Sequence, residues 1–120
     1  MPWPVEYTDE FSVWWKTLGA NAQDDVAAVV GVLEQRGPQL PFPYSSALVG
    51  SRHGHMRELR VQSGGDPLRI IYAFDPRRSA ILLLGGNKAG DKRFYERMIA
   101  RADQLYDIHL GELRREGLIP

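Results

Sequence analysis

Three stretches with a strand-like pattern follow one another between positions 56 and 85 and are joined by short turns. They are "MRELRVQ" (56–62), "LRIIYAF" (68–74) and "SAILLLG" (79–85), and the turns are "SGGDP" and "DPRR". Side chains with a period of two lie alternately on opposite faces of a β-strand, and glycine and proline favour turns. The pattern predicts an antiparallel meander of three strands, around which the rest of the chain must pack.

The alternation also assigns side chains to the two faces of this predicted sheet. In the first stretch, one face carries Met56, Glu58, Arg60 and Gln62, and the other carries Arg57, Leu59 and Val61. In the second stretch, one face carries Arg69, Ile71 and Ala73, and the other carries Leu68, Ile70, Tyr72 and Phe74. Arginine side chains are therefore expected on two neighbouring strands.

Two helices are predicted before the meander, after a short first strand at 3–7. Thr8 is the expected N-cap of the first helix and Gly19 its end, whereas Asn21 is the expected N-cap of the second helix, which stops at Gly37. The apolar stripes are Phe11, Trp14, Trp15 and Leu18 in the first helix, and Val26, Val29, Val30 and Leu33 in the second. The proline-rich segment "GPQLPFPYSS" (37–46) is expected to be an irregular surface connection.

A long final helix is predicted after the meander, with Asp91 as its N-cap. Its apolar face carries Phe94, Met98, Ala102, Leu105, Tyr106, His109 and Leu113, and His109 is expected to be a hydrogen-bonded core residue. We expect this face to pack against the sheet or against the other helices. The sequence thus predicts a single α+β domain over residues 1–120, in which helices cover one face of the sheet.

The charges are distributed unevenly although the formal net charge is zero. Residues 1 to 50 hold two bases and six acids, whereas residues 51 to 101 hold eleven bases and five acids. The basic half suits a polyanion, although solvated faces of ordinary helices and strands would give the same count. Because the sequence has no cysteine, no secretory signal pattern and no long apolar run, we expect a cytoplasmic protein without a membrane partner.

The segment "GGNKAGDK" (85–92) superficially resembles a phosphate-binding P-loop. A P-loop needs lysine and then a hydroxyl residue directly after its last glycine, to reach the phosphates and the magnesium ion. Here Gly90 is followed by Asp91 and Lys92, and the preceding strand belongs to an antiparallel meander. Nucleotide hydrolysis is therefore excluded, and a loop that presents Lys88 ahead of Arg93 and Tyr95 remains.

His53 and His55 are a candidate metal pair, but a catalytic zinc site needs a third protein ligand that the sequence does not offer. A polar loop or an RNA contact is the favoured reading of these two histidines. Acyl transfer is unsupported because the chain has neither a Gly-x-Ser-x-Gly motif nor a cysteine nucleophile. We expect no metal and no cofactor.

RNA can be cleaved without a metal or a cofactor, because its own 2′-hydroxyl attacks the neighbouring phosphorus once this hydroxyl is deprotonated. The protein must then stabilise charge on the phosphoryl oxygens and assist two proton transfers. The candidates for charge stabilisation are Arg57, Arg60, Arg69 and Lys88. Tyr95 is a candidate for stacking on a base or for proton transfer.

In their combined order, "VEYTDEFSVWW", "SRHGHMRELR", "PLRIIYAFDPRRSAILLLGG" and "RFYERMIARADQLYDIHL" resemble the RelE/ParE toxin superfamily, and in particular its HigB-like, phage Gp49-like branch. The resemblance implies a RelE-like fold with an N-terminal strand, a helical hairpin, the meander and a C-terminal helix. It also implies the toxin of a type II toxin-antitoxin system, which cleaves messenger RNA in the ribosomal A site as an endoribonuclease. The implied partners are the ribosome, its mRNA and a helix-turn-helix antitoxin.

The resemblance also assigns roles to residues of this chain. It implies catalytic roles for Arg69, Lys88 and Tyr95, and RNA contacts for Arg57 and Arg60, with Lys92 and Arg93 as further candidates. His53 and His55 stay candidate RNA contacts on the residue pattern alone. Many relatives carry a lysine pair after the last strand, but here Lys88 is followed by Ala89, so Lys92 and Arg93 are alternative ligands of the scissile phosphate. A ParE-like inhibitor of DNA gyrase and an inactive antitoxin-binding domain are the alternative functions, since one fold serves several activities.

Overall fold

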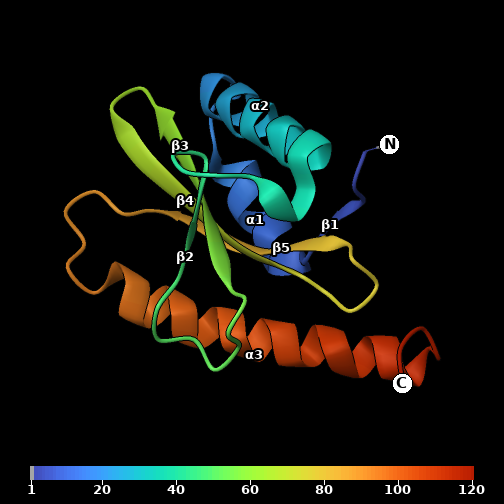
Figure 1. The fold of residues 1–120 in the computed structure, drawn as a ribbon. Coiled ribbons are helices and arrows are strands. Elements are labelled where there is room, and N and C mark those ends of the chain that lie inside the picture. The colour runs from blue at the N-terminus through green and yellow to red at the C-terminus, as the bar shows by residue number, and fades with distance from the viewer. Residues whose placement is uncertain (1) are drawn as a thin grey trace.

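The computed structural model of the protein describes residues 2–120; the predicted domain also includes Met1, which lies outside these residues. The elements are β1 (Val5–Tyr7), α1 (Asp9–Thr17), α2 (Ala20–Arg36), the 3₁₀ helix η1 (Gly37–Gln39), β2 (Ser45–Ala47), β3 (Arg57–Ser63), β4 (Asp66–Phe74), β5 (Ala80–Asn87) and α3 (Phe94–Arg115). The sheet has the order β1-β5-β4-β3-β2, and Figure 1 shows it between the helices. Among the described helices, none is long and apolar enough to cross a membrane.

The predicted meander is confirmed as β3, β4 and β5, which pair antiparallel in sequence order. A two-residue turn joins β3 to β4, and both of its residues, Gly64 and Gly65, have positive φ angles of 55° and 86°. Glycine adopts this backbone without steric strain, as a tight hairpin turn requires. The resulting register places Arg60 opposite Arg69 and Glu58 opposite Ile71.

Helices cover both faces of the sheet, so the prediction that they cover one face was wrong (Figure 1). One core layer lies between the sheet and α3 and includes Met56, Ile71, Ala73, Leu83, Phe94, Met98, Ala102 and Tyr106. The other lies between the sheet and α1 and α2 and includes Phe11, Val26, Leu33, Leu59, Val61, Ile70, Tyr72 and Leu82. Each face of the central strands is apolar, so each needs its own helical layer to exclude water.

Thr8 caps α1 as predicted, because its Oγ1 accepts a hydrogen bond from the Phe11 amide at 3.0 Å. The end of α2 is also confirmed, because the helix stops at Arg36 with Gly37 as its C-cap. The predicted boundaries at Gly19, Asn21 and Asp91 were wrong, since Asn21 lies inside the first turn of α2. Gly19 does not end α1 but is the N-cap of α2, in extended backbone, and its carbonyl accepts a hydrogen bond from the Gln23 amide. Asp91 lies in a turn ahead of α3, and the helix starts at Phe94. The Asp91 carboxylate accepts a hydrogen bond from the Arg93 amide, and the Asp91 carbonyl accepts one from the Phe94 amide.

The proline-rich segment 37–46 is more regular than predicted. It contains η1 and the first residues of β2, whose Ser45 lies opposite Leu59 on β3. Strand pairing is possible here because the prolines precede β2 and the strand itself has a full set of backbone donors. The segment therefore leads into an edge strand that extends the sheet along β3, and residues 51–55, which follow β2, contact α3.

Gly85 and Gly86 lie inside β5, which continues to Asn87, rather than at the exit from the sheet. A methyl group on Gly85 would lie 2.4 Å from the ring of Trp14 on α1, and one on Gly86 would lie 2.9 Å from the ring of Phe94 on α3. The two glycines thus let an aromatic ring approach each face of the strand more closely than any side chain would permit.

Candidate functional site

The carboxylate of Glu58 is the centre of a polar cluster on the α3 side of the sheet, although the side chain is only 5% exposed. Its Oε1 accepts a hydrogen bond from the Tyr95 hydroxyl at 2.7 Å and lies 3.6 Å from Nε of Arg69. Its Oε2 accepts from Ser46 Oγ at 2.6 Å and from Arg60 at 3.3 Å. Side chains from β2, β3, β4 and α3 therefore converge on one buried acid.

Arg69 is the most deeply buried cation of the cluster, at 4% exposure. It donates one hydrogen bond, from an η nitrogen to the carbonyl of Leu68 at 2.9 Å. Within residues 2–120, its Nε has no hydrogen-bond partner, because Glu58 is too distant for a good one. A buried guanidinium with unused donors is well suited to bind a planar or tetrahedral oxyanion.

The register explains why the acid and the arginines occur together. Arg60 and Arg69 lie directly opposite each other on β3 and β4, and like charges in that arrangement repel. Glu58 is two residues from Arg60 on the same face and contacts both guanidinium groups. One carboxylate thus offsets two cations, and the cluster retains a net positive charge that favours an anionic ligand.

Tyr95 lies in the first turn of α3 and is partly buried. Burial raises the pKa of its phenol, and the hydrogen bond to Glu58 adds to this effect while the guanidinium of Arg69 opposes it. The phenol therefore keeps its proton at neutral pH and is available as a proton donor. The ammonium of Lys88 lies 5.9 Å from the centre of the Tyr95 ring, which brings a further cation to this side of the cluster.

The structure does not bring Arg57 to this cluster. Its Nε donates to Ser45 Oγ at 2.8 Å, and Ser45 is hydrogen-bonded to the hydroxyl of Tyr72 at 2.6 Å in the core layer beneath α2. Arg57 and Arg60 are an odd number of residues apart on one strand and consequently lie on opposite faces of the sheet. Of the two predicted RNA contacts on β3, only Arg60 faces Glu58.

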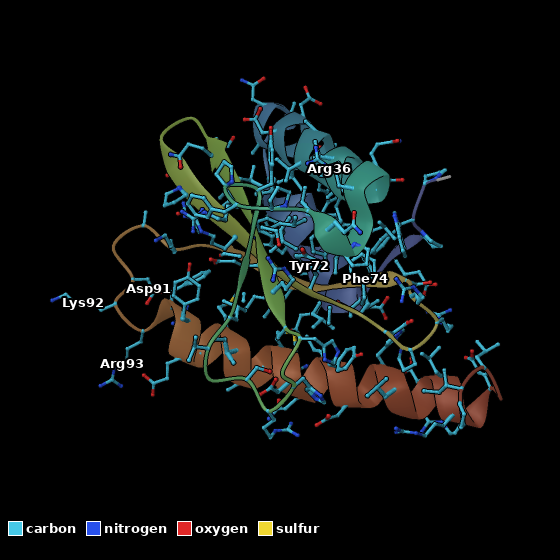
Figure 2. The ribbon with its side chains drawn as sticks, viewed as in Figure 1. Arg36, Tyr72, Phe74, Asp91, Lys92 and Arg93 are labelled. Atoms are coloured by element: carbon cyan, nitrogen blue, oxygen red, sulfur yellow. The ribbon has the colours of Figure 1, made fainter. Side chains whose placement is uncertain are left out.

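Lys92 and Arg93 lie on the exposed loop between β5 and α3 and point away from the body of the protein (Figure 2). In the described part of the chain, neither side chain has a hydrogen bond or ion pair with the cluster. Of the three alternative phosphate ligands on this segment, Lys88 alone is next to Tyr95.

His53 and His55 contact α3 far from Glu58. His53 is 2.9 Å from a carboxylate oxygen of Asp107, and His55 is 3.1 Å from the Tyr106 hydroxyl. Tyr106 is eleven residues beyond Tyr95 on the helix, or roughly 16 Å along its axis. In the chain as described from residue 2 onward, no group of three or more His, Cys, Asp or Glu side chains is arranged to hold a metal ion.

The sequence of the chain matches the family described as phage derived protein Gp49-like (DUF891) over residues 13–107. The chain belongs to the Gp49-like family. It is 41% identical over 106 residues to HigB2, a candidate toxin of Mycobacterium tuberculosis, with 87% of this chain and 53% of HigB2 covered. It is 44% identical over 92 residues to HigB3, a second candidate toxin of that organism, with 76% of this chain and 79% of HigB3 covered.

The Gp49-like chain spans about half the length of HigB2. Among solved structures, it is similar to a mutant of the Escherichia coli toxin RelE in the free state, with a TM-score of 0.59, 12% identity and coverage of 78% of this chain and 92% of RelE. It is also similar to the RelE–RelB complex of Pyrococcus horikoshii, with a TM-score of 0.56, 16% identity and coverage of 75% and 99%. These similarities confirm the predicted RelE-like fold and the resemblance to the HigB-like branch of the superfamily.

Glu58 and Ser46 are the parts of the cluster to which the sequence interpretation assigned no role in this Gp49-like protein. The alternation in the sequence correctly placed Glu58 on the same face of the strand as Arg60. It could also have identified Glu58 as a site residue, because this face carries the apolar Met56 and is therefore expected to be buried. An acid in that position needs a buried cation as its partner. Ser46 gave no such signal, since its strand was not predicted.

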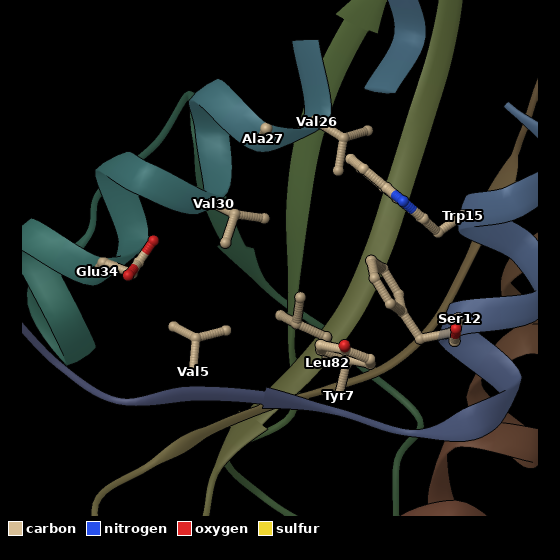
Figure 3. Close-up of a pocket in the computed structure, with 10 residues that line it drawn as sticks. Val5, Tyr7, Ser12, Trp15, Val26, Ala27, Val30, Glu34 and Leu82 are labelled. Atoms are coloured by element: carbon tan, nitrogen blue, oxygen red, sulfur yellow. The ribbon is translucent and has the colours of Figure 1, made fainter. Parts of the chain in front are cut away.

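The opposite face of the Gp49-like fold holds an apolar pocket of about 410 Å³ between β1, α1 and α2 (Figure 3). Its lining includes Val5, Trp15, Val26, Val30 and Leu82, with Glu34 as the charged member. No lysine or arginine is among the described residues that line it. A phosphate would find no cation there, so this pocket does not suit a nucleic acid backbone.

Proposed function

We propose that the protein is the toxin of a type II toxin-antitoxin pair and that it cleaves messenger RNA in the ribosomal A site. The observation that carries the proposal is the juxtaposition of buried Arg69, the Glu58 carboxylate and the protonated Tyr95 phenol. A charge stabiliser, a base and an acid are the three groups that cleavage by the RNA's own 2′-hydroxyl requires. The similarity to the candidate toxin HigB2, and the fold shared with the toxin RelE, support the part of the proposal that the protein is a toxin.

In the proposed reaction, Glu58 accepts the proton of the 2′-hydroxyl, and the 2′-oxygen attacks the neighbouring phosphorus. The bond from phosphorus to the 5′-oxygen breaks, and Tyr95 donates its proton to that leaving oxygen. The products are a 2′,3′-cyclic phosphate and a 5′-hydroxyl, so protons and electrons balance without a metal or cofactor. In the free protein the Tyr95 hydroxyl already donates to Glu58, and we propose that the substrate inserts between them.

Arg69 is the proposed ligand of the phosphoryl oxygens, because its buried guanidinium has unused donors. Lys88 is the proposed second cation, because its ammonium lies beside the Tyr95 ring and would stabilise the phenolate that forms there. Arg60, which is more exposed, is a proposed contact to the adjoining RNA backbone. Lys92 and Arg93 are proposed to attract RNA phosphates from the exposed loop without touching the scissile one.

We further propose that a helix-turn-helix antitoxin neutralises the protein. The similarity to RelE in a RelE–RelB complex and to RelBE2 of M. tuberculosis, a toxin-antitoxin complex, supports an antitoxin as the partner, and the helix-turn-helix class is our proposal. Co-expression with a cognate helix-turn-helix antitoxin should restore growth of cells that the chain alone arrests. Growth arrest that persists despite a stable complex between the two proteins would contradict neutralisation.

A ParE-like inhibitor of DNA gyrase and an inactive antitoxin-binding domain are the alternative functions. Primer extension on RNA from cells that express the chain separates them, because only the nuclease creates new 5′ ends inside coding sequences. Arg69→Ala should abolish these ends, since loss of one charge-stabilising donor typically lowers a rate by about 100- to 1000-fold. Growth arrest without new ends but with gyrase-linked DNA breaks would favour the inhibitor, and growth without arrest would favour the inactive domain.

A further inference from the structure

Two aromatic side chains next to the Glu58 cluster are left largely uncovered by the fold. Phe42 is 68% exposed and Tyr44 is 41% exposed, and both belong to the segment "PFPY" that precedes β2. Exposed rings of this size are unfavourable in water, since a buried aromatic removes far more apolar area than most side chains. Neither ring belongs to the core layers, so packing within the described chain does not account for them.

Backbone hydrogen bonds hold this segment firmly against the edge of β3. The amide of Arg60 donates to the carbonyl of Tyr44 at 2.8 Å, and the amides of Tyr44 and Ser45 both donate to the carbonyl of Pro41 at 3.1 Å. The Arg60 guanidinium lies over the Phe42 ring, 5.2 Å from its centre. The aromatic rings are thus presented by a fixed backbone and next to a cation of the cluster.

A pocket of about 350 Å³ lies between this segment and the strands. Its lining consists of Val29, Pro43, Tyr44, Arg60, Gln62 and Arg69. Pro43, Val29 and the Tyr44 ring give apolar and aromatic walls, whereas the exposed amide of Gln62 offers both a donor and an acceptor. Arg69, whose Nε lacks a hydrogen-bond partner among the described residues, lines this pocket as well as contacting Glu58.

We propose that this pocket binds one unstacked nucleobase of the RNA next to the scissile phosphate and contributes to the choice of cleavage site. The inference rests on the proposed function, and it names a subsite formed by the Tyr44 ring and the Gln62 amide, with Arg60 and Arg69 beside them. Aromatic faces stack on any base, and an amide distinguishes bases by the donors and acceptors on their edges. Arg60 and Arg69 line this pocket and also contact Glu58 of the proposed cleavage site. The bound base and the scissile phosphate would therefore belong to neighbouring nucleotides of one RNA strand.

The chemistry of the walls favours a nucleobase over a segment of a protein. Two guanidinium groups line the pocket, and the one carboxylate in contact with them, Glu58, already compensates part of their charge. An anionic chain that also carries flat rings fits both the cations and the aromatic walls. Only a single strand can deliver a base in this way, because the bases of a duplex are stacked and paired.

The binding test uses the full chain and fluorescent oligonucleotides of 2′-deoxynucleotides, which lack the attacking hydroxyl and cannot be cleaved. Tyr44→Ala should weaken the binding of the single strand by roughly 5- to 150-fold, because a stacked base contributes about that much to affinity. Tyr44→Phe should retain the binding, and Val13→Ala, which removes an exposed apolar side chain from α1, should leave it unchanged. Equal affinity of wild type and Tyr44→Ala would overturn the proposal.

The second readout is the distribution of cleavage sites in cells, mapped by sequencing of the new 5′ ends. Gln62→Ala should change which bases flank the cut while cleavage itself persists, whereas an unchanged distribution would overturn the assignment of base choice to the pocket. If the wild type cleaves no RNA but oligonucleotide binding still depends on Tyr44, the proposed function fails and the base pocket stands. If a duplex binds as tightly as the single strand in every variant, the pocket does not hold a base.

Discussion

The charge of the buried Glu58 carboxylate is expected to be needed for stability, because it compensates the buried guanidinium of Arg69. The substitution Glu58→Gln tests this expectation. The substitution keeps the size of the side chain and its hydrogen-bonding oxygen but removes the negative charge. Arg60 and Arg69 then face each other across β3 and β4 without a carboxylate between them. Arg69 is the critical partner, because it is 4% exposed and cannot turn into water.

The magnitude follows from these burials. Removing one partner of a buried ion pair typically destabilises a protein by about 3–5 kcal/mol, because the other charge stays buried and uncompensated. Arg60 is 30% exposed and adds little. Since glutamine can still bond to Ser46 and Tyr95, we expect a loss near the lower limit, about 3 kcal/mol. For a domain of this size that corresponds to a fall in Tm of roughly 10 °C.

Urea unfolding, followed by the fluorescence of the partly buried Trp14 and Trp15, measures the loss. The matched control is a double-mutant cycle with Arg69→Met, which removes the buried cation and keeps a long apolar side chain. The double variant should be more stable than Glu58→Gln alone, because no unpaired charge is left. A loss below about 1 kcal/mol for Glu58→Gln, or strictly additive losses in the double variant, would refute this view of the cluster.

Three further outcomes are expected. Burial and the nearby Asp75 raise the pKa of Tyr106 from 10.0 to about 12. The protonated phenol therefore contributes fully to the free energy of unfolding below pH 10, and this contribution is lost as the pH rises toward 12. Urea unfolding should show a loss of about 2 to 3 kcal/mol over that range, and Tyr106→Phe should abolish the loss. Gly85→Ala should lower the Tm by several degrees, because the new methyl meets the Trp14 ring, and an unchanged Tm would contradict that packing. In primer extension, Lys88→Ala should reduce cleavage at least tenfold more than Lys92→Ala, and the reverse order would assign the phosphate to the loop.

The sequence predicted the parts of the fold that follow from local periodicity. The meander, the two faces of its strands and the apolar face of the last helix all repeat at the period of their own element. It did not predict that α3 and the pair α1 and α2 cover opposite faces, because periodicity shows which side chains are buried but not by what. The short β2 was missed since three residues after a proline-rich stretch carry no pattern.

The site was predicted in part, for a related reason. Tyr95 and Glu58 are 37 residues apart in the chain, and only the register of the sheet and the start of α3 bring them within 2.7 Å. For Arg57, the sequence contained the right answer and the family resemblance gave a different one. The alternation of the strand placed Arg57 and Arg60 on opposite faces, as the structure does, whereas the resemblance assigned an RNA contact to both.

The chemistry of the RNA ends tests the central claim most directly. Cleavage by the 2′-hydroxyl leaves a 2′,3′-cyclic phosphate and a 5′-hydroxyl, whereas a metal-activated water would leave other ends. We expect RNA from cells that express the chain to carry these two ends at sites inside translated messages. The variants Arg69→Ala and Tyr95→Phe should lose the ends while their Tm shows that they stay folded. New ends with a 5′-phosphate, or the expected ends at undiminished frequency in both folded variants, would contradict the proposed site.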